Sequence, residues 1–420
     1  MTASSPSRPR LLLILPSTTY RAAAFIEAAG RLDLDVTIGS DHRSTLAAAQ
    51  PARLLALDFG SAEAIAGVVR DFHARHPLTG VLGVSDETAI VAAIASEAIG
   101  VPHNSVDACR AAGDKHRQRV LLTREGLKVP PFIRLSFEDD LAAFAATAHY
   151  PCVVKPTRLS MSRGVMRADD PAGLVVAVQR LRAMLAEPGT AKACGDAAGQ
   201  FLVEQFIPGT EVALEGVLTR GGLRVLALFD KPDPLDGPFF AETIYATPSR
   251  LPANLQEEVA ACVERSARAL GLTRGPVHAE LRLNEDGPWL IELAARPIGG
   301  RCSAVLRFGE DGSVSLEELL LKAQLEGWRI GELERESTAV AVMMIPVEKA
   351  GTLAAVRGAD EARRVPWVDD VVITAHPGQE LVPLPEGSHY LGFIYAWAED
   401  PETATRAVRD AHAKLEVELA

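Results

Sequence analysis

The first hundred residues alternate between short apolar runs and longer segments rich in alanine. Runs such as LLLIL at 11–15, DVTIG at 35–39 and GVLGVSD at 80–86 are followed by stretches with helical spacing, for example ETAIVAAIASEAIG at 87–100. Short buried strands that alternate with helix-length segments are typical of a parallel sheet. We therefore predict an α/β domain built from βαβ units over residues 1–115.

The turn after the first of these runs, PSTTY at 16–20, contains no glycine. A dinucleotide site of the Rossmann type needs a GxGxxG turn here, because its main chain must approach a pyrophosphate closely. We therefore expect this domain to be a scaffold that frames a substrate pocket.

Composition narrows the class of protein. The chain has 420 residues, 48% hydrophobic and 23% charged, as in a soluble enzyme of two or three domains. A net charge of −12 argues against nucleic acid or an anionic membrane as a partner. The five cysteines form no CxxC motif, and no apolar run approaches the roughly 20 residues that span a bilayer. We expect a cytoplasmic protein with no membrane partner, and a homodimer as the default oligomer.

Lys155 ends an apolar strand and precedes a loop rich in hydroxyl side chains, in the segment VVKPTRLSMSRGV at 153–165. A P-loop places its lysine after the glycines and before a helix, so this is a different arrangement. A lysine at a strand end, together with hydroxyls such as that of Ser162 and with loop N–H groups, can enclose a triphosphate. A solvated lysine beside an exposed loop is the alternative.

A second candidate element is FLVEQFIPGTEVAL at 201–214, which has the pattern of two strands joined by a Pro-Gly kink. Such a hinge leaves main-chain groups near Gln205 and Ile207 free to pair with an adenine edge. Glu211, just past the kink, could accept ribose hydroxyls. An edge strand with a bulge explains the pattern equally well.

The segment from 277 to 301, VHAELRLNEDGPWLIELAARPIGGR, is predicted to be a β-hairpin. The sequence Glu-Asp-Gly at 285–287 suits a three-residue loop closed by a left-handed glycine. With this loop Asn284 opposes Pro288, and Leu281 meets Ile291 on the apolar face.

In this register Glu280 lies directly across from Glu292. Two opposed carboxylates repel each other, so a cation between them is the natural compensation. Glutamate oxygens on rigid strands suit Mg²⁺, which shares its remaining sites with water and substrate phosphates. Two solvated glutamates in a slightly different register are the alternative. His278 faces the same side and could contact substrate or have a structural role.

These elements follow one another in an order that resembles the ATP-grasp superfamily of carboxylate-amine ligases. The likeness runs from about 110 to 302 and is greatest to L-amino-acid ligases, which make dipeptides. It implies a mixed α/β and α+β ATP-grasp fold: the N-terminal Rossmann-like domain at 1–115, a small lid domain at 116–203, and a large domain at 204–420. The strand-like segments after 338 would form a final α+β part of the large domain.

The resemblance also implies a role for each matching residue, with ATP and Mg²⁺, or Mn²⁺ in its place, as cofactors and amino acids as substrates. Arg296 would stabilise an acyl phosphate and the tetrahedral intermediate, and Glu242 would hold a substrate ammonium group. The other implied positions are Lys115, Lys155 and Ser162 for the phosphates, Glu204, Gln205, Phe206 and Ile207 for adenine, Glu211 for ribose, and Glu280 and Glu292 for the metal. The sequence departs from the family pattern in having only Gly164 in the phosphate loop and Ala294 in place of a common asparagine.

The implied reaction is the attack of a carboxylate on the γ-phosphate of ATP, followed by attack of an amine on the acyl phosphate. The lid would exclude water from this intermediate. Two alternatives stay open: a ligase or carboxylase that uses another carboxylate and nucleophile, and a nucleotide-binding module without turnover. The absence of a Met-Lys-Met biotin-attachment motif lowers the biotin-dependent version.

Overall fold

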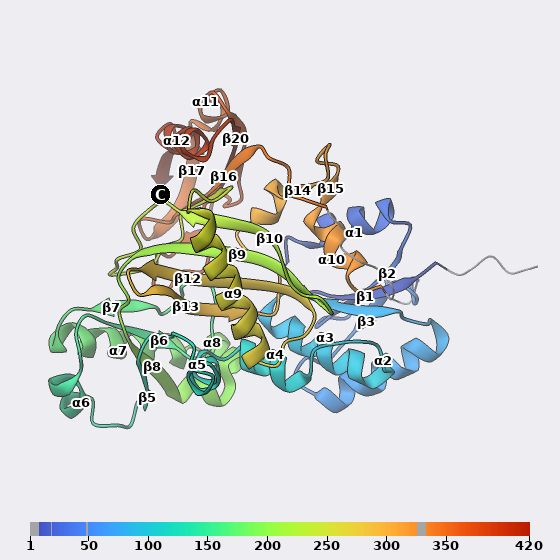
Figure 1. Ribbon diagram of the computed structural model, residues 1–420, viewed down its shortest axis with the longest axis horizontal. Coiled ribbons are helices and arrows are strands. Elements are labelled where there is room, and N and C mark those ends of the chain that lie inside the picture. Colours follow the sequence, from blue (N-terminus) through green and yellow to red (C-terminus); the bar gives the residue numbers. More distant parts are fainter. Residues whose placement is uncertain (1–7, 18, 48, 326–332) are drawn as a thin grey trace, which may run out of the picture.

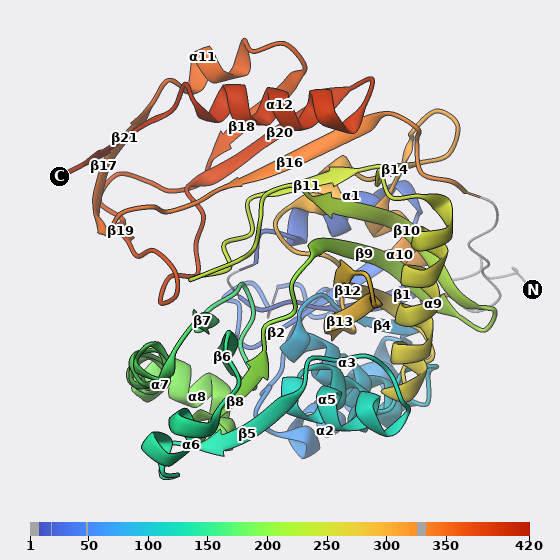
Figure 2. The ribbon, with the colours of Figure 1, turned by 60° about the vertical axis from the view of Figure 1, so that its left-hand side comes forward.

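The computed structural model describes residues 8–17, 19–47, 49–325 and 333–420. Three sheets carry most of the chain, and Figure 1 shows the large sheet in the centre, with the small sheet at the lower left and the N-terminal sheet at the right. The C-terminal helices α11 (Ala359–Arg363) and α12 (Pro401–His412) and the small sheet lie on opposite sides of the large sheet, as Figure 2 shows. Parallel and antiparallel sheets, each with helices packed on it, give the mixed α/β and α+β class that the sequence predicted.

The N-terminal sheet is parallel, as predicted, with the strand order β3-β2-β1-β4. Leu11 and Leu13 of β1 belong to one hydrophobic core, whereas Leu12 and Ile14 belong to another, because the sheet is covered on both faces. Its elements are β1 (Arg10–Ile14), α1 (Ala22–Arg31), β2 (Asp35–Ser40), β3 (Leu54–Ala56), α2 (Ala62–Arg75), β4 (Gly80–Gly83), α3 (Asp86–Ile99) and α4 (Val106–Ala112).

The small sheet is antiparallel, with the strand order β5-β8-β6-β7. The Asp170 side chain caps α7 by accepting from the Gly173 N–H at 2.8 Å, and proline occupies the first helical position. The expected limit between 203 and 204 falls inside β8, and the domain limits as a whole stay predictions. The elements of this part are α5 (Lys115–Arg124), β5 (Phe132–Ser136), α6 (Leu141–Thr147), β6 (Cys152–Pro156), β7 (Met166–Ala168), α7 (Pro171–Ala186), α8 (Pro188–Cys194), the 3₁₀ helix η1 (Gly195–Gly199) and β8 (Gln200–Gln205).

The large sheet has eight antiparallel strands in the order β13-β12-β9-β10-β11-β16-β20-β18. Helix α9 packs its apolar face on β9, β12 and β13 (Figure 1). The elements around this sheet are β9 (Thr210–Thr219), β10 (Gly222–Lys231), β11 (Ile244–Thr247), α9 (Ala253–Ala269), β12 (Gly275–Asn284), β13 (Gly287–Ala294), the 3₁₀ helix η2 (Cys302–Val305), β14 (Arg307–Phe308), β15 (Val314–Ser315) and α10 (Leu316–Lys322).

The remaining elements complete the C-terminal part of the chain. Helix α12 packs on β16 and β20, and β17 pairs with β19 and β21 in a separate three-stranded sheet. These elements are β16 (Ala339–Ile345), β17 (Gly351–Arg357), α11 (Ala359–Arg363), β18 (Val368–Ile373), β19 (Glu380–Leu381), β20 (Gly392–Ala398), α12 (Pro401–His412) and β21 (Glu416–Leu419).

The β12–β13 hairpin forms, but its turn differs from the prediction. Asn284 pairs with Gly287, so the loop has two residues instead of three, and the expected pairing of Leu281 with Ile291 is wrong. A bulge at Ile291 inserts one residue into β13 and restores the predicted opposition of Glu280 and Glu292. The Ile291 carbonyl accepts a hydrogen bond from Arg119 at 2.6 Å.

Candidate active site

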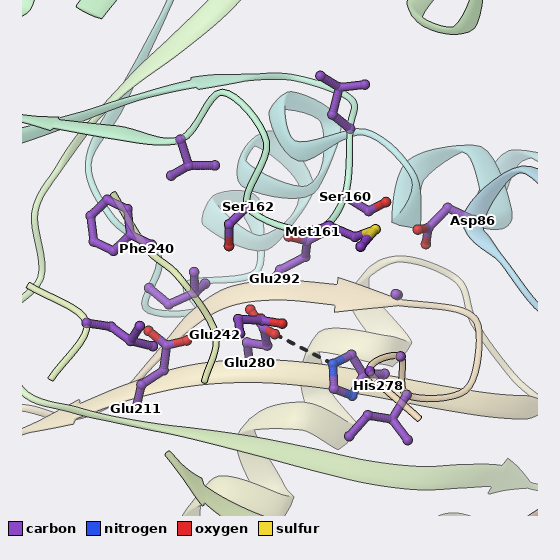
Figure 3. A pocket seen from close by; sticks show the side chains of 18 of the residues that line it. Asp86, Ser160, Met161, Ser162, Glu211, Phe240, Glu242, His278, Glu280 and Glu292 are labelled. Carbon is purple, nitrogen blue, oxygen red and sulfur yellow. Dashed lines mark ion pairs between the residues drawn. The ribbon is translucent and has the colours of Figure 1, made fainter. Parts of the chain in front are cut away.

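A cavity of about 420 Å³ opens where the three sheets meet. Its walls come from the β1–α1 loop, the start of α3, the β6–β7 loop, the segment after β8, the β12–β13 hairpin and the residues around Gly299. Figure 3 shows several of these side chains converging, with Ser160, Met161 and Ser162 above the carboxylates. All twelve predicted site residues line this one cavity: Lys115, Lys155, Ser162, Glu204, Gln205, Phe206, Ile207, Glu211, Glu242, Glu280, Glu292 and Arg296.

Lys155 lies at the end of β6, where its ammonium group pairs with Glu204 at 2.6 Å. The same carboxylate accepts from Arg119 at 2.8 Å, and all three side chains are buried. Burial lowers the pKa of Lys155 to about 8, although Glu204 opposes the shift. Burial would raise the pKa of Glu204, but Arg119 and Lys155 outweigh it and hold that pKa low. The Glu204 side chain is therefore occupied by cations, and its main chain lies inside β8 between Phe132 of β5 and Val153 of β6. Its part in adenine binding stays a prediction.

The main chain of the hinge is partly occupied. The Gln205 N–H donates to Pro131 at 2.9 Å, and the Ile207 carbonyl accepts from Arg282 at 2.7 Å. The expectation that the groups near both residues are free is therefore met only in part. The Ile207 N–H has no partner among the described hydrogen bonds and remains for an adenine edge. Beside it, the Phe206 ring lies 4.8 Å from the Arg282 guanidinium.

Lys115, the first residue of α5, connects the phosphate loop to the carboxylate pair. Its ammonium group donates to the Leu159 carbonyl at 2.8 Å and to Glu292 at 3.2 Å. The loop is strained, because Leu159, Met161 and Ser162 adopt φ values of 117°, 62° and 56° without being glycine.

A buried lysine that the sequence analysis missed organises the carboxylates. Lys231, the last residue of β10, contacts Glu211 at 2.8 Å, Glu280 at 3.1 Å and Glu242 at 3.2 Å. Burial raises the pKa of Glu242 to about 7 against the pull of Lys231, and the neighbouring Glu280 adds to the rise. For Glu280 burial acts in the same direction, but Lys231 and His278 outweigh it and hold its pKa well below the usual value. A lysine at the end of an apolar strand was the available signal.

His278 lies behind the carboxylates on β12. Its Nε2 atom is 3.6 Å from Glu280, and its Nδ1 atom is 3.5 Å from the fully buried Glu215. Glu215 also accepts a hydrogen bond from the Ile298 N–H at 3.0 Å. The Glu215 side chain therefore connects His278 of the hairpin to the segment that follows Arg296.

Arg296 is held by a residue of the N-terminal domain. Its Nε donates to Asp86 at 3.0 Å, and Asp86 is the first residue of α3. Burial opposes the charge of Arg296, but Asp86 overcomes it and raises the pKa of the guanidinium. The sequence analysis missed Asp86, because its strand-to-helix position gave no hint of a partner more than two hundred residues away.

The opposed Glu280 and Glu292 fit a divalent cation, because they project from adjacent strands of a rigid hairpin. Among the described residues, no group of three or more His, Cys, Asp or Glu side chains is arranged as metal ligands. Mg²⁺ is commonly bound through one or two carboxylates, with phosphates and water completing its shell.

No helix in the described ranges has the length and apolar character needed to cross a membrane.

Family models match three parts of the chain. The ATP-grasp domain matches residues 148–305, and the ATP-grasp N-terminal domain matches 26–103. The chain belongs to the ATP-grasp superfamily. Within this superfamily, its residues 343–420 match the L-amino acid ligase C-terminal domain 2. The resemblance inferred from the motifs is thereby confirmed.

Three proteins that are similar to this chain are ligases. It is 32% identical over 48% of its length to a D-alanine–D-alanine ligase of Aromatoleum aromaticum, and 28% identical over 49% to an alanine–anticapsin ligase of Bacillus subtilis. It spans 62% and 45% of the lengths of these two relatives. The crystal structure of an L-amino acid ligase from Bacillus licheniformis superposes with a TM-score of 0.79 and 26% identity, covering 99% of this chain and 100% of that one.

Proposed function

We propose that the protein is an ATP-dependent ligase that joins two amino acids through an acyl phosphate and releases ADP and phosphate. The donor amino acid supplies the carboxyl group that is phosphorylated, and the acceptor amino acid supplies the amine. The observation that carries the proposal is the convergence of Lys115, Lys155, Arg296 and the opposed Glu280 and Glu292 on one cavity. A module that only bound nucleotide would have no use for all five.

The nucleotide end of the cavity has the features that ATP requires. The Ile207 N–H can pair with the adenine edge, and Lys155 stands where a phosphate chain would run. Lys115 is anchored to the phosphate loop through Leu159, so that loop and Ser162 can close over the phosphates. We assign residues 116–203 to the closing lid, 1–115 to the N-terminal domain and 204–420 to the large domain.

Glu280 and Glu292 would hold Mg²⁺, or Mn²⁺ in its place. When bound, the metal ion would neutralise the charge that builds up on the transferred phosphoryl group. Arg296 would stabilise the oxygens of the acyl phosphate, because its planar guanidinium suits a bidentate oxygen partner. Asp86 fixes the Arg296 guanidinium at the cavity wall before substrate arrives.

The charge balance of the cluster supports a cationic ligand. Four carboxylates, of Glu211, Glu242, Glu280 and Glu292, meet three lysine and arginine cations, of Lys115, Lys231 and Arg282. His278 lies between Glu280 and the fully buried Glu215. When all four carboxylates are ionised and the charge of His278 is counted against Glu215, one negative charge has no counter-ion. A substrate ammonium group at Glu242 or a metal ion at the hairpin would satisfy it.

We also propose a cytoplasmic location and small-molecule partners only. All five cysteines are buried and unpaired, which suits a reducing compartment. A homodimer remains the default expectation for the assembly.

The test is phosphate release from Mg-ATP by the purified protein over a matrix of paired L-amino acids, with mass spectrometry of the products. We expect release that depends on particular pairs, with a dipeptide and ADP as products. If no pair stimulates release although ATP binds, the protein is not an amino-acid ligase. In that case the protein is a ligase that uses another carboxylate and nucleophile, or a module that binds nucleotide without turnover.

A further inference from the structure

We propose that Arg21 binds the carboxylate of the acceptor amino acid. This inference rests on the proposed ligase function and deepens it, since it assigns a residue to the substrate group that the reaction does not consume. Arg21 lies in the β1–α1 loop, at the N-cap of α1, and lines the same cavity as Arg296.

The first observation is the state of the cations around the cavity. Each of the other lysine and arginine side chains that line it is ion-paired: Lys115 with Glu292 at 3.2 Å, Lys155 with Glu204 at 2.6 Å, Arg282 with Glu211 at 3.2 Å and Arg296 with Asp86 at 3.0 Å.

Arg21 is different. Its guanidinium donates to the carbonyls of Pro297 and Ile298, and no ion pair joins it to a carboxylate of the described residues. The buried Glu215 lies close enough for Arg21 to lower its pKa, but burial is the stronger influence and that pKa is raised. Arg21 therefore brings to the cavity a positive charge that is not committed to a protein anion.

The second observation is the position of Arg21 beside Arg296. The Pro297 carbonyl accepts from the Arg21 guanidinium at 3.3 Å and from the Arg296 guanidinium at 3.1 Å. Two arginine side chains from different domains thus meet at one oxygen. One of them is neutralised by Asp86, whereas the other is not.

This geometry suits the acceptor. In an α-amino acid a single carbon separates the attacking amine from the carboxylate, and the amine must come within about 3.5 Å of the carbonyl carbon that it attacks. If Arg296 stabilises the oxygens of that reacting centre, the acceptor carboxylate must lie next to Arg296. Arg21 is the adjacent cation. Arg21 is also the N-cap of α1 (Ala22–Arg31), whose first turn has no acidic residue and no side-chain cap, so the potential at this helix end favours an anion.

The competing explanation is that Arg21 only supports the Pro297–Ile298 segment. The two explanations are separated by comparing an acceptor L-amino acid with its carboxamide, which keeps the amine and side chain but has no negative charge. The variant is Arg21→Gln. The matched control is Arg31→Gln, which removes an arginine from the far end of the same helix, where it pairs with Glu318 at 3.1 Å.

For Arg21→Gln we expect the KM of the free acid to rise about 10-fold or more, because a hydrogen-bonded charge pair is lost. The KM of the carboxamide and the KM of ATP should stay unchanged, so that the preference for acid over amide collapses. Arg31→Gln should keep the wild-type preference. Arg21→Lys, which keeps the charge, should restore part of it. Should Arg21→Gln misfold, thermal unfolding will reveal it and the Arg21→Lys ratio carries the test.

Equal losses for acid and amide would overturn the inference and leave Arg21 a support of the loop. An unchanged acid preference in the Arg21→Gln variant would overturn it as well. Both results leave the proposed function intact, since the wild-type enzyme would still join amino acids. Failure of the wild type to join any pair refutes the proposed function itself, and the inference with it.

Discussion

Replacing Lys231 by methionine should destabilise the large domain by about 3–5 kcal/mol at pH 8. The change keeps the length and much of the volume of the side chain but removes an ammonium group with contacts of 2.8, 3.1 and 3.2 Å to three carboxylates. Only 3% of the lysine side chain is exposed, so solvent cannot replace it. Removing one member of a buried ion pair costs roughly this amount, because the remaining charge is left without compensation.

The loss should depend on pH in a defined direction. The pKa of Glu242 is raised to about 7 by burial, so its folded value lies above its unfolded value of 4.5. A carboxyl group of this kind takes up a proton on folding, and its ionisation lowers stability as pH rises from about 4.5 through 7. Without Lys231 the pKa of Glu242 should rise further. The difference in stability between the variant and the wild type should therefore be smaller at pH 5.5 than at pH 8.

Thermal unfolding followed by circular dichroism measures both quantities. For a cooperative unit of 150–250 residues, 1 kcal/mol shifts Tm by about 2–4 °C, so we expect a drop of at least about 6 °C at pH 8. Lys349→Met, at an exposed position, is the control and should shift Tm by less than about 2 °C. A drop equal to that of the control at pH 8, or one that grows as the pH is lowered, would refute the assignment of Lys231 as the counter-ion of this cluster.

Four further results are expected. Glu292→Gln should nearly abolish turnover while the protein stays folded, since it removes a metal carboxylate; normal activity, measured as phosphate release, would contradict the metal assignment. Glu242→Ala should chiefly raise the KM of an amino-acid substrate and leave that of ATP unchanged, and a selective effect on ATP would argue against the ammonium role. ATP affinity, measured by calorimetry, should fall as pH rises through about 8, because Lys155, with its lowered pKa, loses its positive charge in that range. Lys155→Arg should remove this fall. A fall that persists in the variant would implicate another group. Glu386→Gln should raise the KM of ATP, because Glu386 pairs with Arg180 of α7 and ties the small domain to the C-terminal segment. It should change Tm little, since the pair is partly exposed. An unchanged KM would show that the pair has no part in closure of the lid.

The opposition of Glu280 and Glu292 could be predicted because two local errors in the predicted register cancel. The opposition of Glu280 and Glu292 was deduced with a three-residue loop and no bulge, whereas the hairpin has a two-residue loop and one bulge. The two differences cancel beyond the bulge, so both carboxylates still project on one side. Between the turn and the bulge they do not cancel, and there Leu281 meets Leu290 instead of Ile291. Such a bulge depends on tertiary contacts that the local sequence does not reveal. Here the carbonyl of the inserted Ile291 accepts a hydrogen bond from Arg119 of α5.

The charged partners that balance the site could not be deduced in the same way. Lys231, Arg119 and Asp86 come from a strand, a helix and a different domain, and each acts on a carboxylate or guanidinium far away in the sequence. Their chemistry is visible in the sequence, but their pairing depends on how the sheets are placed. A buried charge reveals itself only when its partner is known, because an exposed lysine or aspartate would look the same.

Glu211 shows how ion pairs that cannot be deduced from the sequence affect a predicted binding residue. Its position after the Pro-Gly kink predicts a ribose ligand, yet its two oxygens accept from Lys231 at 2.8 Å and from Arg282 at 3.2 Å. An ionised carboxylate has about four lone-pair sites, so two remain for ribose hydroxyls while both cations stay bound. The two cations also fix the orientation of the carboxylate. The same side chain can therefore hold the charge cluster together and accept a ribose, and a substitution there should disturb stability and nucleotide binding together.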